Sequence, residues 1–482
     1  MSGRAGLRPR RIIPAIMVLL AAAVATGPAR SASPAAEAPA AGGFRVPPPA
    51  RTILKNGLTL LVLERHAVPL VEIELLIKAG SAADPAGKEG LASLTARMLK
   101  RGTRTRPAQQ FAQEVEFVGG TLESSATRDA TLVQGEFASR DVEVGLNLLA
   151  DMVQNPAFGE EDLSREKRLV LADLASGLDD PAEVADDAYM AWLLGAHPYG
   201  RPVAGYTRSV PGLTRGDVAA YAEARLVPNN AILAIVGDLG AAQAAQRVDK
   251  YFGAWKRRAL VEAKLPDPAP VRGRKVLLVD KPDATQSQIR FGNLGMRRGD
   301  PDYLPALVAN TVLGGGFTSW LVDEVRVKRG LTYGIRSRFD ALRFAGAFVV
   351  STFSRNASVG ETIKVSLDQI RRLRAGQVPA EDLDKARNYR AGQYPLRIEA
   401  PDALAAEIVG VELYGLEPDY INQYQKRVRG VGLDAVKRVA ARYVPLDDLA
   451  IVVIGPASQL KESLAPLGPV TVRPIDAATG PY

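Results

Sequence analysis

The segment Ala224-Arg-Leu-Val-Pro228, with the apolar run 231–236 and Gly237 after it, has a close copy 217 positions further along the chain. The copy is Ala441-Arg-Tyr-Val-Pro445, followed by the apolar run 449–454 and Gly455. Two more pairs of segments recur in the same order, at offsets of 215 and 220. They are 136–140 with 352–355, and 161–163 with 381–383. A repeat that keeps its order at nearly one spacing indicates two copies of one folding unit.

Each copy mixes strand patterns with helix patterns. Asn56-Gly57 separates two short apolar stretches and favours the tight turn of a hairpin. Val71–Ile77 is apolar at alternate positions, which predicts a strand with one buried face. Segments of helical periodicity lie between such strands in both copies. We therefore predict an α+β fold that consists of two duplicated halves.

The ends of the chain differ from its body. Residues 1–31 hold five arginines, no acidic residue and an apolar run, which is typical of a cleaved secretory signal. A retained membrane anchor is the alternative, but the run is shorter than the roughly 20 apolar residues that a spanning helix needs. The other predicted bounds are 32–50 for an Ala/Pro-rich tether, 51–258 for the first half, 259–275 for a Pro-rich linker, 276–468 for the second half and 469–482 for a tail.

Charge and cysteine content exclude several classes of protein. The formal net charge of +8 falls to +3 without the five arginines of the predicted signal. No basic block with interleaved aromatic residues is present, which argues against nucleic-acid binding. The chain has no cysteine, so it has neither disulfides nor thiolate metal sites. Export without disulfides suits a bacterial periplasm, and we predict a periplasmic or otherwise exported protein.

The segment 90–103, GLASLTARMLKRGT, resembles the active-site helix of the pitrilysin–insulinase family of zinc peptidases. In that family the helix carries H-x-x-E-H, because histidines four apart share one zinc ion and the glutamate polarises the attacking water. The three positions are Ser93, Ala96 and Arg97 in this chain. The resemblance places Asp173 at the position of the further acidic ligand.

Other residues also argue against a metal site. The two histidines, His66 and His197, lie 131 positions apart, and we interpret both as surface or turn residues. Arg97 would put a cation where a divalent metal should lie. We therefore predict no metal cofactor in this chain and no zinc-protease activity of the chain alone. Glu123 and Ser124 depart from the family's substrate-binding strand, and an ordinary edge strand protected by a charge is the simpler interpretation.

The second half carries two further matches to the family. Gly314, Gly315 and Gly316 resemble its glycine-rich loop and allow close backbone approach. A phosphate-binding loop is excluded because the Gly-Lys-Ser/Thr ending is missing. Arg326 and Tyr333 match an arginine and a tyrosine that reach the scissile peptide in active members. The alternative is a surface ion pair for the arginine and a core contact for the tyrosine.

The resemblance spans about residues 51–468 and implies two halves that face each other across a cavity. Some bacterial members consist of two different chains, one with the zinc motif and one with the Arg/Tyr pair. We predict that this chain is the second kind, a non-catalytic subunit that binds a peptide or unfolded protein beside a homologous, zinc-bearing partner. The alternative is a structural or scaffolding member. A metal-independent hydrolase that uses Glu166 and Asp173 lacks a nucleophile–base pair.

Overall fold

The computed structural model describes residues 44–260 and 265–480. The predicted signal, residues 1–31, lies outside the described residues, as do most of the predicted tether and part of the predicted linker. Within the described part of the chain, no helix is both long and apolar enough to cross a membrane. The residues from Arg45 onward form one compact unit.

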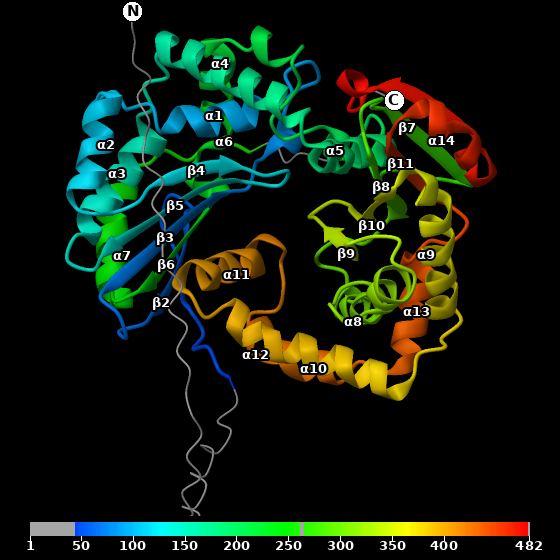
Figure 1. The fold of residues 1–482 in the computed structure, drawn as a ribbon. Helices are drawn as coiled ribbons and strands as arrows, with labels where there is room; N and C mark the ends of the chain where they lie inside the picture. Colours follow the sequence, from blue (N-terminus) through cyan, green and yellow to red (C-terminus); the bar gives the residue numbers. More distant parts are fainter. Residues whose placement is uncertain (1–43, 261–264, 481–482) are drawn as a thin grey trace, which may run out of the picture. The chain divides into compact units, whose positions relative to one another are not determined.

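The first half of the body is built on a six-stranded sheet in the order β1-β2-β6-β3-β5-β4 (Figure 1). Only β2 and β6 run parallel to each other. The predicted hairpin joins β1 to β2, and Gly57 has a φ of 92° there, which glycine adopts without strain. The strands are β1 (Ala50–Ile53), β2 (Thr59–Glu64), β3 (Leu70–Ile77), β4 (Glu123–Ala126), β5 (Thr131–Ala138) and β6 (Ala231–Gly237).

The second half contains a six-stranded sheet in the order β12-β7-β11-β8-β10-β9. Five of its strands, β7-β11-β8-β10-β9, repeat β2-β6-β3-β5-β4 in order and direction. The edges differ, because β12 pairs parallel with β7 whereas β1 pairs antiparallel with β2. The predicted fold of two duplicated α+β halves is therefore confirmed. The strands are β7 (Arg274–Asp280), β8 (Gln286–Leu294), β9 (Ile335–Ala341), β10 (Gly346–Arg355), β11 (Leu449–Gly455) and β12 (Val470–Pro474).

Most helices pack within the half to which they belong in the sequence. In the first half they pack on the side chains of β3 that alternate with Glu72 and Glu74, such as Ile73 and Leu75. These helices are α1 (Leu91–Leu99), α2 (Ala108–Phe117), α3 (Val142–Gln154), α4 (Glu160–Gly177), α6 (Arg215–Arg225) and α7 (Ala241–Phe252). The second half has α8 (Tyr303–Leu313), α9 (Val359–Arg374), α10 (Ala380–Arg397), α12 (Tyr420–Arg429), α13 (Leu433–Tyr443) and α14 (Ala457–Leu464).

Two helices are exchanged between the halves (Figure 1). α5 (Pro181–Leu194) packs on β8 and β11 of the second sheet, and α11 (Pro401–Leu413) packs on β3 and β6 of the first. Each sheet is thereby covered on both faces. The strand predicted at 71–77 is confirmed as β3, but the prediction that only one of its faces is buried is wrong, because Glu72 and Glu74 are only 4% and 2% exposed. Their side of β3 is the side that α11 covers.

Candidate functional site

α1 carries the three positions of the altered zinc motif. The helix begins after Gly90, whose φ of 95° favours glycine. The carboxylate of Asp84 accepts hydrogen bonds of 2.9 Å from Gly90 and from the second helical residue, which satisfies amide groups that a first turn leaves free. Ser93 and Arg97 are four residues apart and therefore share one face of the helix. Ala96 is fully buried.

Arg97 lies between two carboxylates of α4. Its Nε donates to Glu166 Oε2 at 3.0 Å, and a terminal nitrogen lies 3.1 Å from Asp173 Oδ2. Arg101, just beyond the C-terminal end of α1, donates to the other Glu166 oxygen at 2.6 Å. The side chain of Glu166 is 1% exposed, so two guanidinium groups rather than water compensate its charge. Asp173, which the resemblance places at a metal-ligand position, thus binds an arginine.

The side chains present do not fit a zinc ion. Across residues 44–260 and 265–480, no group of three or more histidine or acidic residues could hold a metal ion. His66 is exposed, and hydrogen bonds to Asp238 and then Glu64 raise its pKa. His197 Nδ1 accepts the backbone N–H of Tyr199 at 3.1 Å, while burial lowers the pKa of its imidazole. The two histidines therefore belong to separate local networks.

The edge strand β4 contacts α1, and two side chains of β4 bind it to that helix and its C-terminal cap. Ser124 Oγ donates to the Ala96 carbonyl at 2.6 Å, and Glu123 forms an ion pair with Lys100. Among the described strands, β4 pairs only with β5. A charge on a free edge discourages pairing with another chain. This arrangement favours a protected edge over a strand that binds substrate.

Arg326 and Tyr333 lie together at the surface of the second half. Arg326 belongs to a short π-helix, η5 (Val322–Lys328), a conformation that is frequent at functional sites. Its guanidinium carbon is 4.9 Å from the centre of the Tyr333 ring and 5.3 Å from that of Phe317. Tyr333 and Phe317 are 79% and 75% exposed. Tyr333 therefore makes no core contact, and no carboxylate of the described residues forms an ion pair with Arg326.

The glycine-rich loop packs against the outer edge of β9. A Cβ on Gly314 would lie 2.7 Å from the Ser337 nitrogen, and one on Gly315 would lie 2.7 Å from Asn310 Nδ2. Both positions therefore require glycine, whereas a Cβ on Gly316 would meet no atom closer than 3.7 Å. The Gly314 carbonyl accepts the Ser337 N–H at 3.0 Å, and Asn310 Nδ2 donates to the Ser337 carbonyl at 2.8 Å. These bonds occupy the edge of β9 at Ser337.

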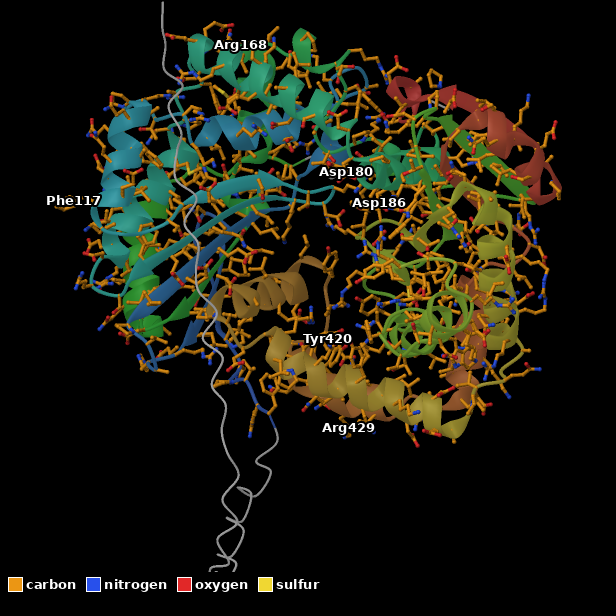
Figure 2. The ribbon with its side chains drawn as sticks, in the orientation of Figure 1. Phe117, Arg168, Asp180, Asp186, Tyr420 and Arg429 are labelled. Atoms are coloured by element: carbon orange, nitrogen blue, oxygen red, sulfur yellow. The ribbon has the colours of Figure 1, made fainter. Side chains whose placement is uncertain are left out.

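A cavity of about 780 Å³ lies beside this loop, and we call it the arginine cavity. Its lining includes no acidic residue and five arginines, Arg290, Arg326, Arg336, Arg338 and Arg390. Arg290 and Arg338 donate to Asp186 of α5 (Figure 2) at 2.7 and 3.4 Å. Burial alone would raise the pKa of Asp186, but these two arginines lower it. Sequence reasoning found only Arg326, because the other arginines belong to no motif and lie on three different elements, β8, β9 and α10.

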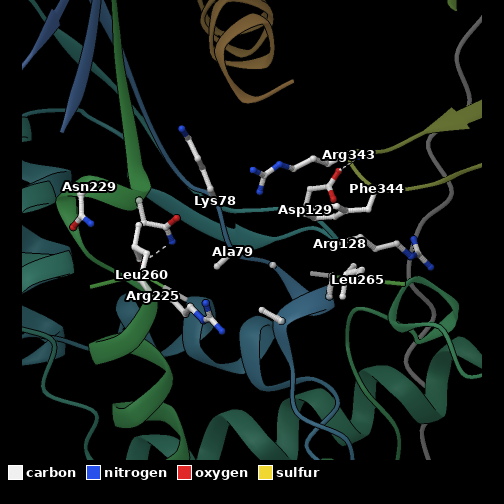
Figure 3. Close-up of a pocket in the computed structure, with 14 residues that line it drawn as sticks. Lys78, Ala79, Arg128, Asp129, Arg225, Asn229, Leu260, Leu265, Arg343 and Phe344 are labelled. Carbon is white, nitrogen blue, oxygen red and sulfur yellow. Dashed lines mark hydrogen bonds between the residues drawn. The ribbon is translucent and has the colours of Figure 1, made fainter. Parts of the chain in front are cut away.

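A smaller cavity of about 320 Å³ lies where the halves meet (Figure 3). Asp129 in its wall accepts the hydroxyl of Tyr199 and, at 2.9 Å, the backbone N–H of Arg343. Burial raises the pKa of Asp129. None of the site residues predicted from the sequence lines this cavity.

The predicted residues thus form two separate groups. Ser93, Ala96, Arg97 and Asp173 lie on α1 and α4, while the glycine-rich loop, Arg326 and Tyr333 lie in the second half. No hydrogen bond, ion pair or ring contact of the described residues joins the two groups.

Comparisons with known proteins agree with this geometry. The family model of insulinase (peptidase family M16) matches residues 60–207, and that of the peptidase M16 inactive domain matches residues 212–389. An uncharacterized zinc protease of Mycobacterium leprae is 30% identical over 301 residues, which cover 62% of this chain and 68% of that protein. A protein of Streptomyces coelicolor, also named an uncharacterized zinc protease, is 26% identical over 86% of this chain and 92% of its own length.

Solved structures show the same fold. A peptidase M16 inactive domain from Pseudomonas fluorescens superposes with a TM-score of 0.79 at 27% identity, over 85% of this chain and 98% of that chain. A protease from Helicobacter pylori gives a TM-score of 0.77 at 20% identity, over 84% and 99% of the two chains.

Proposed function

Because the chain belongs to the insulinase family, peptidase family M16, we propose that it is a non-catalytic subunit of a two-chain exported metallopeptidase. In this proposal the chain binds the peptide, and it supplies Arg326 and Tyr333 to the zinc site of a homologous partner. The observation that carries the proposal is a contrast between the halves. Arg97, at a position of the altered zinc motif, binds the carboxylates of Glu166 and Asp173, whereas Tyr333 is exposed and Arg326 lies half-buried beside it.

The altered motif supports the absence of a zinc ion from this chain. A divalent cation placed between Glu166 and Asp173 would lie within a few ångströms of the Arg97 guanidinium, and that repulsion is unfavourable. Arg101 adds a second positive charge to the same carboxylate. Ser93 and Ala96 offer neither an imidazole nor a general base.

The accessible pair supports a role in transition-state stabilisation. When water attacks a peptide carbonyl, the oxygen gains negative charge, and nearby donors stabilise that charge. Tyr333 offers a hydroxyl and Arg326 offers a fixed fork of N–H donors. The π-helix, the ring of Phe317 and the ring of Tyr333 hold the guanidinium at the surface.

The test is reconstitution of the purified chain with its zinc-bearing partner, identified by co-purification and mass spectrometry. Tyr333→Phe and Arg326→Ala should each lower peptide turnover by about a hundredfold or more, as is typical when one such donor is lost. Assembly should not change. Tyr251→Phe and Arg140→Ala are the matched controls, because both residues lie in the first half, Tyr251 half-buried and Arg140 exposed, and both variants should keep full turnover. If Tyr333→Phe and Arg326→Ala assemble and retain normal turnover, the scaffolding alternative is the better one.

A further inference from the structure

The arginine cavity has an excess of positive charge that the protein itself does not balance. Arg290 is 4% exposed, and its donors go to Asp186, to Gln288 and to backbone carbonyls. Arg338 binds Asp340 at 2.8 Å in addition to Asp186. These two arginines are therefore structural. Arg326, Arg336 and Arg390 form no ion pair with any carboxylate of the described residues.

The three remaining arginines come from three different elements. Arg326 lies on η5, Arg336 on β9 and Arg390 on α10, and all three line the one cavity. Arg390 Nε donates to Thr311 Oγ1 at 2.6 Å, which fixes one end of its guanidinium. Like charges that converge on one cavity repel each other, and an anion that lies between them offsets this repulsion. Guanidinium groups bind carboxylates through paired N–H donors, so the composition fits a carboxylate ligand.

We propose that the arginine cavity binds an acidic segment of a peptide, through its aspartate or glutamate side chains. Addition of a peptide strand to β9 is excluded at Ser337, because Gly314 and Asn310 already occupy that part of the edge. Recognition therefore depends on side chains. Phe317 lines the same cavity and is 75% exposed, which offers an apolar surface beside the charges. The proposal rests on the proposed function only in taking the ligand to be a peptide.

The experiment measures binding by the purified chain alone, without the partner. A fluorescein-labelled peptide of about ten residues with a central Asp-Glu pair is compared with its Asn-Gln analogue by fluorescence anisotropy. The acidic peptide should bind at least about tenfold more tightly, since hydrogen bonds to a charged group are strong. Arg336→Gln combined with Arg390→Gln should abolish this preference. Arg355→Gln, an exposed arginine at the end of β10 that does not line the cavity, should retain it.

Charge reversal gives an independent measurement that does not depend on the double variant folding. Arg336 is exposed, so Arg336→Glu should fold. This variant should bind the acidic peptide more weakly and a Lys-Lys analogue more tightly than the unchanged chain does. Equal affinity for the acidic peptide and its amide analogue would overturn the proposal. So would an acidic preference that survives Arg336→Gln with Arg390→Gln, because the site would then lie elsewhere. The proposal would also be overturned if inorganic phosphate displaced the labelled peptide as effectively as the unlabelled peptide does. That result would indicate a simple anion site.

The outcome is distinguishable from that of the proposed function. Tyr333→Phe tests turnover in the two-chain enzyme and should leave the acidic preference of this chain unchanged. Arg336→Gln with Arg390→Gln tests the preference and involves neither Tyr333 nor Arg326. A chain that fails one test can therefore still pass the other.

Discussion

The contacts of Glu166 with Arg97 and Arg101 should stabilise the first half only while the carboxylate and at least one guanidinium group are both present. The perturbation is Arg97→Met together with Arg101→Met, which keeps much of the aliphatic volume and removes both guanidinium groups. The side chain of Glu166 is 1% exposed, so water cannot replace them. The double variant therefore leaves a buried carboxylate without compensation.

The expected loss follows from that burial. Breaking a buried ion pair by removing one side of it costs about 3–5 kcal/mol. Arg97→Met alone should cost less, because its side chain is 36% exposed and Arg101 still donates to Glu166 at 2.6 Å. Arg371→Met is the matched control, because the Arg371–Asp368 pair is 60% and 42% exposed. An exposed pair of that kind contributes under about 1 kcal/mol.

The assay is urea unfolding followed by tryptophan fluorescence, with calorimetry to test whether the transition is two-state. Adding Glu166→Met to the double variant should recover most of the lost stability, because apolar replacement of all three groups removes the buried charge. Two results would refute this reasoning. One is a double variant that loses no more stability than Arg371→Met, and the other is a triple variant that recovers nothing.

Three further outcomes are expected. The purified chain should hold no stoichiometric zinc by elemental analysis, and a variant with a restored H-x-x-E-H motif should bind it weakly. The restoring substitutions are Ser93→His, Ala96→Glu and Arg97→His. Burial raises the pKa of Glu72 to about 8 and that of Glu74 to about 7, above the ordinary 4.5. Stability should therefore fall as pH rises from about 4.5 towards 8, and the melting temperature of Glu72→Gln should fall less. Gly314→Ala should lower the melting temperature, because its Cβ would lie 2.7 Å from the Ser337 nitrogen. Gly316→Ala, where no atom lies within 3.4 Å, should leave it nearly unchanged; equal effects of the two alanines would contradict the packing argument.

Local patterns in the sequence were sufficient to predict the repeated fold and to recognise that the metal motif is lost. The recurrence of Ala224–Pro228 as Ala441–Pro445 predicted two halves, and five strands of each sheet follow the same order. Asn56-Gly57 predicted its hairpin because a two-residue turn depends on its own backbone conformations. The resemblance supplied Arg326 and Tyr333. These residues are seven positions apart, and both lie in one short segment that consists of η5 and the loop after it.

Only the tertiary structure revealed which residues from distant segments meet. α5 and α11 exchange sheets, so a strand that alternates like a half-exposed one has glutamates buried beneath a helix more than 300 positions away. Arg97 reaches Glu166 and Asp173 across two helices, and Arg326, Arg336 and Arg390 converge on one cavity from three elements. Such contacts leave no periodicity in the sequence, because periodicity reports which face of an element is buried and not what buries it. The charge compensation of Glu166 is therefore a property of packing, which no single segment encodes.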